Sequence, residues 1–192
     1  MKNIIVPFVS ACLFLSACSM DEIPQASVDK ETVFSNEKGL ETYSYSFYNM
    51  LPSVTDGYSK DAMCDYGAVT NYDDFIRAGA YSPEVSSGWS WTDLRNINYF
   101  IENCTNDAVD ESIRNNYIGL ARFFRAYFYY KKVVRFGDVP WIDRTLTVDD
   151  ELLYAPRDSR TIVMDQVLED LDFACEHITR TSDETGSLVT KW

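Results

Sequence analysis

The stretch that decides the fold is DESIRNNYIGLARFFRAYFYYKKVVRFGDVPW, residues 110–141. Apolar residues recur in its first part at three- and four-residue steps, the spacing of one face of an α-helix; they are Ile113, Tyr117, Leu120, Ala121, Phe124 and Phe128. Arg135 suits the last turn, Gly137 can adopt the left-handed C-terminal conformation, and Pro140 cannot continue a helix. The stretch therefore predicts one long helix from about Asp110 to Phe136.

A second apolar face runs along the same predicted helix. Its members follow the same steps and are Phe123, Tyr127, Tyr130 and Val134. A helix with two apolar faces is expected to be buried on two sides, so we expect other helices to sandwich it and assign these residues to the core rather than to a cofactor site. We expect Arg122 and Arg125 to pair with acidic neighbours.

Two segments of this stretch carry a resemblance to a known family. Residues 119–130, GLARFFRAYFYY, and residues 135–141, RFGDVPW, resemble the SusD/RagB family. The family pattern is a helix with an Arg-Ala pair and aromatic residues, closed by Arg-x-Phe/Tyr-Gly-Asp-Val-Pro. Members are surface glycan- and nutrient-binding lipoproteins of the Bacteroidota with a tetratricopeptide-like scaffold. They act as a lid over a SusC-like TonB-dependent barrel.

Composition excludes some classes of function. The 192 residues include 30 acidic and 17 basic residues, a formal charge of −13, which argues against binding nucleic acid. The five cysteines form no CxxC pair, so neither a zinc site nor a disulfide framework is predicted. We expect Cys64, Cys104 and Cys175 to be buried thiols, and the lone His177 to be a helix histidine rather than a catalytic one. No metal or cofactor is expected.

The N-terminus reads as a bacterial lipoprotein leader. Residues 1–17 combine Lys2 with a short apolar run, too short to span a bilayer comfortably. Leu-Ser-Ala-Cys at residues 15–18 fits a lipobox, so we expect cleavage before Cys18 and acylation of that residue. Residues 18–35 read as the lipidated end and a tether. Acidic Asp21 and Glu22 resemble the surface-export signal of Bacteroidota lipoproteins, which implies an outer-membrane, cell-surface location.

Further helices are predicted at residues 36–51, 92–103 and 160–179. Together with the first they predict an all-α fold of tetratricopeptide-like helical hairpins with long aromatic-rich loops, above all residues 56–90. The expected N-terminal caps are Asn36, Thr92 or Asp93, and Asp158 or Ser159. The inward face of the last helix is expected to hold Ile162, Val163, Val167, Leu168, Leu171, Ala174, Cys175 and Ile178. Its acidic run, Asp165, Glu169, Asp170, Asp172 and Glu176, is expected to face water.

Residues 186–192, GSLVTKW, look like the start of another helix. Family members have a Gly-x-Val-(Thr/Ser)-Lys segment there that opens a repeat helix. We therefore expect residues 36–192 to be the N-terminal portion of a SusD-like helical domain that is incomplete at its C-terminus.

No catalytic motif is found, so we expect binding without catalysis. Sugar binding needs aromatic faces and planar polar groups, and residues 65–98 offer Tyr66, Tyr72, Asp73, Asp74, Arg77, Tyr81, Trp89, Trp91, Asn96 and Asn98. The resemblance favours Trp91 and Asn96, with Arg77 and Asp74 as weaker matches. The alternative is that Trp91 is a hydrophobic staple at a helix entry and Asn96 a solvated residue.

The resemblance implies an oligosaccharide-binding lipoprotein that works with a SusC-like transporter in nutrient uptake. The alternatives are a peptide-uptake lid of the RagB kind and a scaffold fragment that contacts the transporter without binding ligand. Exposed, coplanar rings of Trp89, Trp91 and Tyr81 would favour the glycan, whereas their burial in the helical core would favour the scaffold.

Overall fold

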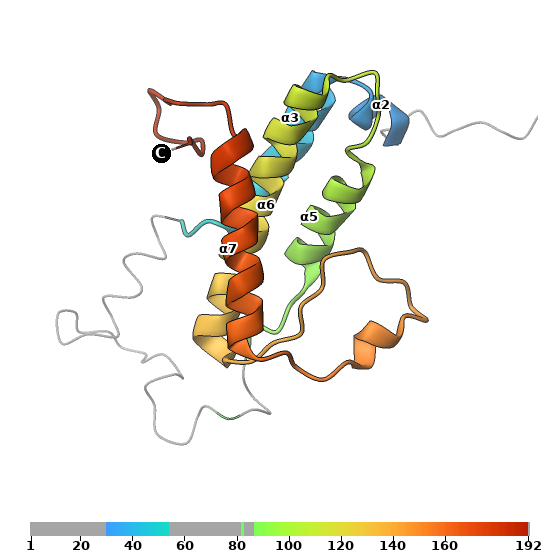
Figure 1. The fold of residues 1–192 in the computed structure, drawn as a ribbon, viewed down its shortest axis with the longest axis vertical. Helices are drawn as coiled ribbons and strands as arrows, with labels where there is room; N and C mark the ends of the chain where they lie inside the picture. Colours follow the sequence, from blue (N-terminus) through green and yellow to red (C-terminus); the bar gives the residue numbers. More distant parts are fainter. Residues whose placement is uncertain (1–29, 54–81, 83–86, 192) are drawn as a thin grey trace, which may run out of the picture. The chain divides into compact units, whose positions relative to one another are not determined.

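A computed structural model describes residues 30–53, 82 and 87–191 (Figure 1). The chain divides into the units Met1–Lys30 and Glu31–Trp192, and the second contains the candidate site. Its described elements are all helical, which confirms the all-α class. The α-helices are α2 (Lys30–Phe34), α3 (Glu37–Ser44), α5 (Thr92–Asn103), α6 (Glu111–Phe136) and α7 (Arg160–His177), and the 3-10 helices are η1 (Tyr45–Met50) and η2 (Glu151–Tyr154). None of the described helices is both long and apolar enough to cross a lipid bilayer.

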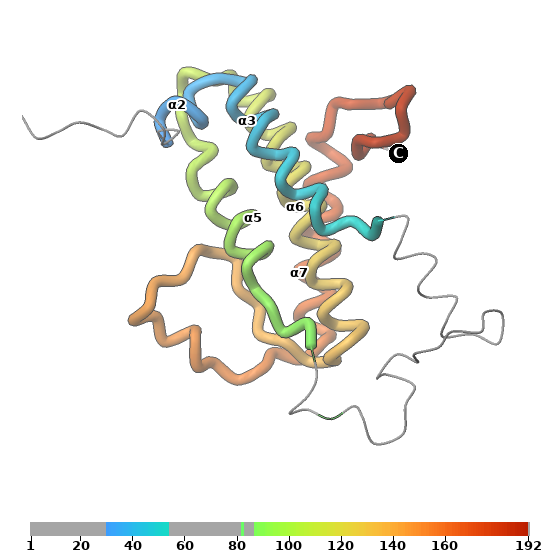
Figure 2. The backbone as a smooth tube through the Cα atoms, turned by 180° about the vertical axis from the view of Figure 1, so that it is seen from behind, coloured from blue at the N-terminus to red at the C-terminus, as the bar shows by residue number. Residues whose placement is uncertain are grey.

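Helix α6 is the centre of this unit. It packs against α3, α5 and α7 (Figures 1 and 2). The predicted bounds are confirmed to within one residue, and Gly137 ends the helix with φ 70° while its N–H donates to the carbonyl of Val133 at 2.9 Å. Glycine is favoured where a helix ends with a positive φ, because glycine has no Cβ.

The sandwich around α6 is confirmed, but the predicted second apolar face is not its inner surface. Helix α7 approaches α6 closely at Gly119, where a Cβ would lie 3.6 Å from the Cα of Ala174. Tyr130 is 54% exposed and Val134 is 68% exposed, so the prediction that they belong to the core is wrong.

The predicted first helix is confirmed, but its second half is a tighter 3-10 helix. Asn36 caps α3 as expected, because its Oδ1 accepts the N–H of Gly39 at 2.8 Å. Leu40 and Phe47 from this segment are buried against Phe100 of α5 and Phe124 of α6, among other apolar side chains. Burial of such side chains is what holds α3 and η1 to the rest of the fold.

Helix α7 differs from the prediction on two of its faces. Ser159 caps it as expected. Ile162 and Leu168 are 54% and 57% exposed, and Cys175 is also exposed, so they are not inward-facing. Asp170, predicted to face water, is only 2% exposed. The reason is a buried cation on α6, described below.

Two predicted helix starts are also corrected. Trp91 occupies the N-cap of α5 and makes no capping bond through its side chain, so neither Thr92 nor Asp93 is the cap. Residues 186–191 are not helical. The Asp183 carboxylate accepts the N–H groups of Ser187 and Leu188 at 2.6 and 2.9 Å, which holds this segment in a turn.

Candidate functional site

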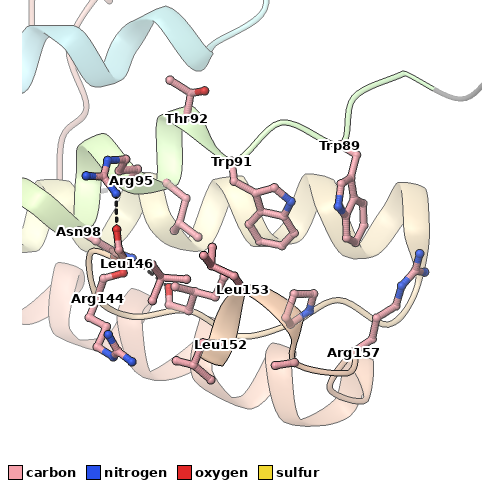
Figure 3. A pocket seen from close by; sticks show the side chains of 14 residues that line it. Trp89, Trp91, Thr92, Arg95, Asn98, Arg144, Leu146, Leu152, Leu153 and Arg157 are labelled. Carbon is pink, nitrogen blue, oxygen red and sulfur yellow. Dashed lines mark hydrogen bonds between the residues drawn. The ribbon is translucent and has the colours of Figure 1, made fainter. Parts of the chain in front are cut away.

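A hollow of about 610 Å³ lies beside the N-terminal end of α5 (Figure 3). The opposite wall is the segment between α6 and α7, residues 140–157. We call it the tryptophan hollow; its lining is Trp89, Trp91, Thr92, Leu94, Arg95, Asn98, Pro140, Ile142, Arg144, Leu146, Leu152, Leu153, Ala155 and Arg157. Its size falls within the range of small-molecule sites, roughly 300–1,000 Å³.

The two tryptophans are the most prominent side chains of the hollow. Their rings meet edge to face, with centroids 5.2 Å apart and planes at 80°. Trp91 is half-buried and packs against Phe128, with centroids 5.6 Å apart. Trp89 is 42% exposed. The rings are therefore not coplanar, but Trp89 presents aromatic surface to the hollow while Trp91 anchors it to the core.

The wall formed by residues 140–145 is held in place by Asn98. Its Nδ2 donates to the carbonyl oxygens of Ile142 and Arg144 at 3.0 and 3.2 Å. Its Oδ1 accepts a bond of 3.3 Å from Arg125, which also donates to the carbonyl of Asp143 at 3.3 Å. Asn98 is fully buried, so these bonds fix both the side chain and the wall.

A buried ion pair supports this arrangement from behind. Arg125 donates from Nε and Nη2 to the two carboxylate oxygens of Asp170, both at 2.7 Å. Arg122 lies 3.7 Å from the same carboxylate and stacks its guanidinium 4.1 Å from the ring centre of Phe173. The prediction that both arginines pair with an acidic neighbour is confirmed.

Tyr129 makes the third attachment of the wall. Its hydroxyl accepts the N–H of Ile142 at 2.7 Å and donates to the carbonyl of the same residue at 3.2 Å. The side chain is fully buried, and this burial raises the pKa of Tyr129 above its usual value. The phenol therefore stays protonated and able to donate.

Arginines surround the mouth of the hollow. Arg95 donates to the carbonyl of Leu146 at 2.5 Å (Figure 3), and the guanidinium of Arg157 lies 4.8 Å from the ring centre of Trp89. Arg144 is bonded to the carboxylate of Asp150 and thereby lowers the pKa of that carboxyl. The mouth can offer several hydrogen-bond donors around an apolar floor.

Lys132 adds a buried cation behind Trp91. Its Nζ donates to the carbonyl of Gly88 and lies 5.5 Å from the Trp91 ring centre. Burial lowers the pKa of Lys132, and the charge of Asp93 opposes that effect. The lysine ties the turn that carries both tryptophans to α6.

The sequence-predicted residues divide into three groups. Trp89 and Trp91 come together in the hollow. Asn96 lies elsewhere: it does not line the hollow and is partly buried, its Oδ1 accepts the hydroxyl of Tyr43 at 2.7 Å, and its Nδ2 donates to Ser46 at 2.9 Å. Asp74, Arg77 and Tyr81, with Cys18 and Cys64, lie outside the described residues.

The sequence reasoning missed the opposite wall. Arg144, Leu152 and Arg157 come from a segment without helical periodicity. Only the presence of arginines in an otherwise acidic chain could have indicated this wall from the sequence.

The described residues offer no group of three His, Cys, Asp or Glu side chains that could hold a metal ion. Cys104 is buried, as expected, and its burial raises the pKa of the thiol to about 11. The Nδ1 of His177 lies 3.0 Å from the carbonyl of Phe173, and the rings of the two residues stack with their centroids 3.9 Å apart.

The arrangement of the hollow is suited to binding an amphipathic ligand that has one apolar face and several polar groups.

Comparison with known proteins shows which proteins this chain is similar to. A SusD-like family model, described as "Starch-binding associating with outer membrane", matches residues 32–190. SusD-like protein P25 of Formosa agariphila is 25% identical over 218 residues, an alignment that covers 100% of this chain and 41% of that protein. The crystal structure of a SusD-like protein from Bacteroides fragilis superposes with a TM-score of 0.62 at 24% identity, covering 83% of this chain and 33% of the other. The chain thus spans less than half of either relative.

Proposed function

We propose a sugar-binding role for this chain, which belongs to the SusD-like family of starch-binding proteins associating with the outer membrane. The tryptophan hollow binds a short stretch of an oligosaccharide during nutrient uptake, and no bond is broken. The observation that carries the proposal is the exposed ring of Trp89 beside a mouth of arginine donors.

The chemistry of the hollow fits this ligand class. A sugar ring has apolar C–H faces that pack on an aromatic ring and hydroxyl groups that need planar polar partners. Trp89 supplies the first, and Arg95 and Arg157 supply the second. The floor of Leu94, Ile142 and other apolar side chains excludes water beneath the ligand.

The anchoring and the partner are also part of the proposal. Cys18 carries the lipid anchor, which holds the protein at the cell surface, and a SusC-like TonB-dependent transporter receives the sugar. The lipobox at residues 15–18 and the resemblance of residues 119–141 support these two statements. Trp91 serves as the packed support of Trp89.

Affinity electrophoresis through gels containing starch, and a panel of other polysaccharides, tests the proposal. Retardation of the wild-type chain by at least one polysaccharide is expected, and Trp89→Ala should lose it. Tyr130→Ala is the matched control, because Tyr130 is an aromatic side chain of comparable exposure that does not line the hollow. Equal retardation of the Trp89→Ala and Tyr130→Ala variants would place sugar binding elsewhere; no retardation by any polysaccharide would refute the function.

A further inference from the structure

The charged side chains that line the tryptophan hollow are positive, whereas the chain as a whole has a net negative charge. The sequence has 30 acidic residues and 17 basic ones. Yet the described lining of the hollow includes Arg95, Arg144 and Arg157 and contains neither aspartate nor glutamate. A random sample of this chain's charged residues would be mostly acidic, so the hollow is a local basic site in an acidic protein.

Two of these arginines have no carboxylate partner among the described residues. Arg144 is paired with Asp150. By contrast, Arg95 donates to the backbone carbonyl of Leu146, and Arg157 donates to the backbone carbonyl of Asp138 at 3.4 Å. A guanidinium has five N–H donors in a planar fork, so each keeps donors for a ligand.

Arg157 is placed to act together with the aromatic ring. Its guanidinium lies 4.8 Å from the ring centre of Trp89 (Figure 3). A sugar in contact with Trp89 would therefore bring its substituents within reach of this cation. The ammonium of Lys132, 5.5 Å from the ring of Trp91, adds positive charge from the other side of the same turn. No described carboxylate lies within salt-bridge distance of Lys132.

We infer that the hollow selects an acidic glycan, one whose sugars bear carboxylate or sulfate groups. This inference rests on the proposed sugar-binding function and names its ligand class. The guanidinium of Arg157 binds the anionic group through charge-assisted hydrogen bonds, and Arg95 supplies a second cation across the hollow. The two parallel N–H donors of a guanidinium can bind both oxygens of a carboxylate or two oxygens of a sulfate group.

Calorimetric titration of the full chain with matched ligand pairs tests this. Hexagalacturonate and its methyl ester share one sugar backbone, but only the first is charged; the same holds for a sulfated dextran oligomer and dextran itself. We expect the charged member of at least one pair to bind about tenfold or more tightly than the neutral one, the ratio that one charged hydrogen bond provides. That ratio should shrink as NaCl rises from about 0.05 to 0.5 M, because salt screens exposed charges. The pair that shows the preference identifies carboxylate or sulfate as the recognised group.

Arg157→Met should weaken binding of the charged ligand much more than binding of the neutral one, which loses only a hydrogen-bond donor, so the charge preference should fall by most of its size. Arg157→Lys should retain part of it. The matched control is Arg160→Met, which removes an exposed arginine three residues away that does not line the hollow. Binding of neutral glycans with no charge preference, or a preference of unchanged size in Arg157→Met, would overturn the inference and leave the proposed function standing. Failure to bind any glycan, charged or neutral, would overturn both.

Discussion

Replacing Arg125 by methionine should destabilise the fold more than any surface charge change. Arg125 is 6% exposed and Asp170 is 2% exposed, and two bonds of 2.7 Å join them. The variant leaves the Asp170 carboxylate buried, with only the more distant guanidinium of Arg122, 3.7 Å away. Removing one partner of a buried ion pair costs about 3–5 kcal/mol. For a domain of this size each kcal/mol shifts the melting temperature by about 2–4 °C, so a decrease of about 6–20 °C is expected.

Urea denaturation followed by circular dichroism at 222 nm measures the loss of unfolding free energy. The double variant Arg125→Met/Asp170→Leu should recover at least half of it, because it removes the uncompensated buried charge. Lys38→Met is the control, since Lys38 pairs with Glu41 on the surface with 78% of its side chain exposed, and its unfolding midpoint should not change. A loss below about 1 kcal/mol for Arg125→Met, the value of a surface pair, would refute the reasoning.

Two further predictions concern buried groups. Tyr129→Phe leaves the backbone N–H of Ile142 without its partner, although the carbonyl of Ile142 keeps its bond from Asn98, so the variant should cost about 1–3 kcal/mol by urea denaturation and weaken sugar binding. Unchanged stability and affinity would show that the Tyr129 hydroxyl does not hold the wall. At pH 8 Cys175, which is exposed, should be alkylated by iodoacetamide well before Cys104, whose pKa of about 11 keeps the thiol protonated until the pH approaches that value. Mass spectrometry of the peptides gives both rates, and equal rates in the folded chain would contradict the burial of Cys104.

The periodic spacing of apolar residues predicted the helices well, because that spacing follows directly from the turn of an α-helix. The long helix around residues 111–136 and the helix at 92–103 were located to within a residue. What it could not predict is which apolar face meets a neighbour. Tyr130 and Val134 match the spacing of a buried face, but both are exposed, and α7 approaches α6 closely at Gly119 instead.

Side-chain carboxylates explain the other differences. Asp170 belongs to an acidic run that reads as a solvated face, and only the position of Arg125, 45 residues earlier, makes it a buried residue. The turn at residues 183–188 is local, and the Asp183 carboxylate holds it by accepting the N–H groups of Ser187 and Leu188. Only the burial of Asp170 depends on a partner that lies far away in the sequence.

The candidate site was predictable in part. Trp89 and Trp91 were recognisable as an aromatic pair next to a helix start, and both line the hollow. Arg144 and Arg157 were not, because the segment that carries them has no helical periodicity, and bonds to residues of α5 and α6, among them Asn98 and Tyr129, hold it at the hollow.

Nuclear magnetic resonance of the indole N–H groups tests the central claim most directly. The chain, labelled with nitrogen-15, is titrated with the oligosaccharide that corresponds to the most strongly retarding polysaccharide. We predict that the indole signals of Trp89 and Trp91 shift together along one binding curve, while that of Trp141, which packs on Tyr129 and does not line the hollow, stays in place. Saturable binding that leaves both Trp89 and Trp91 unshifted would contradict the account.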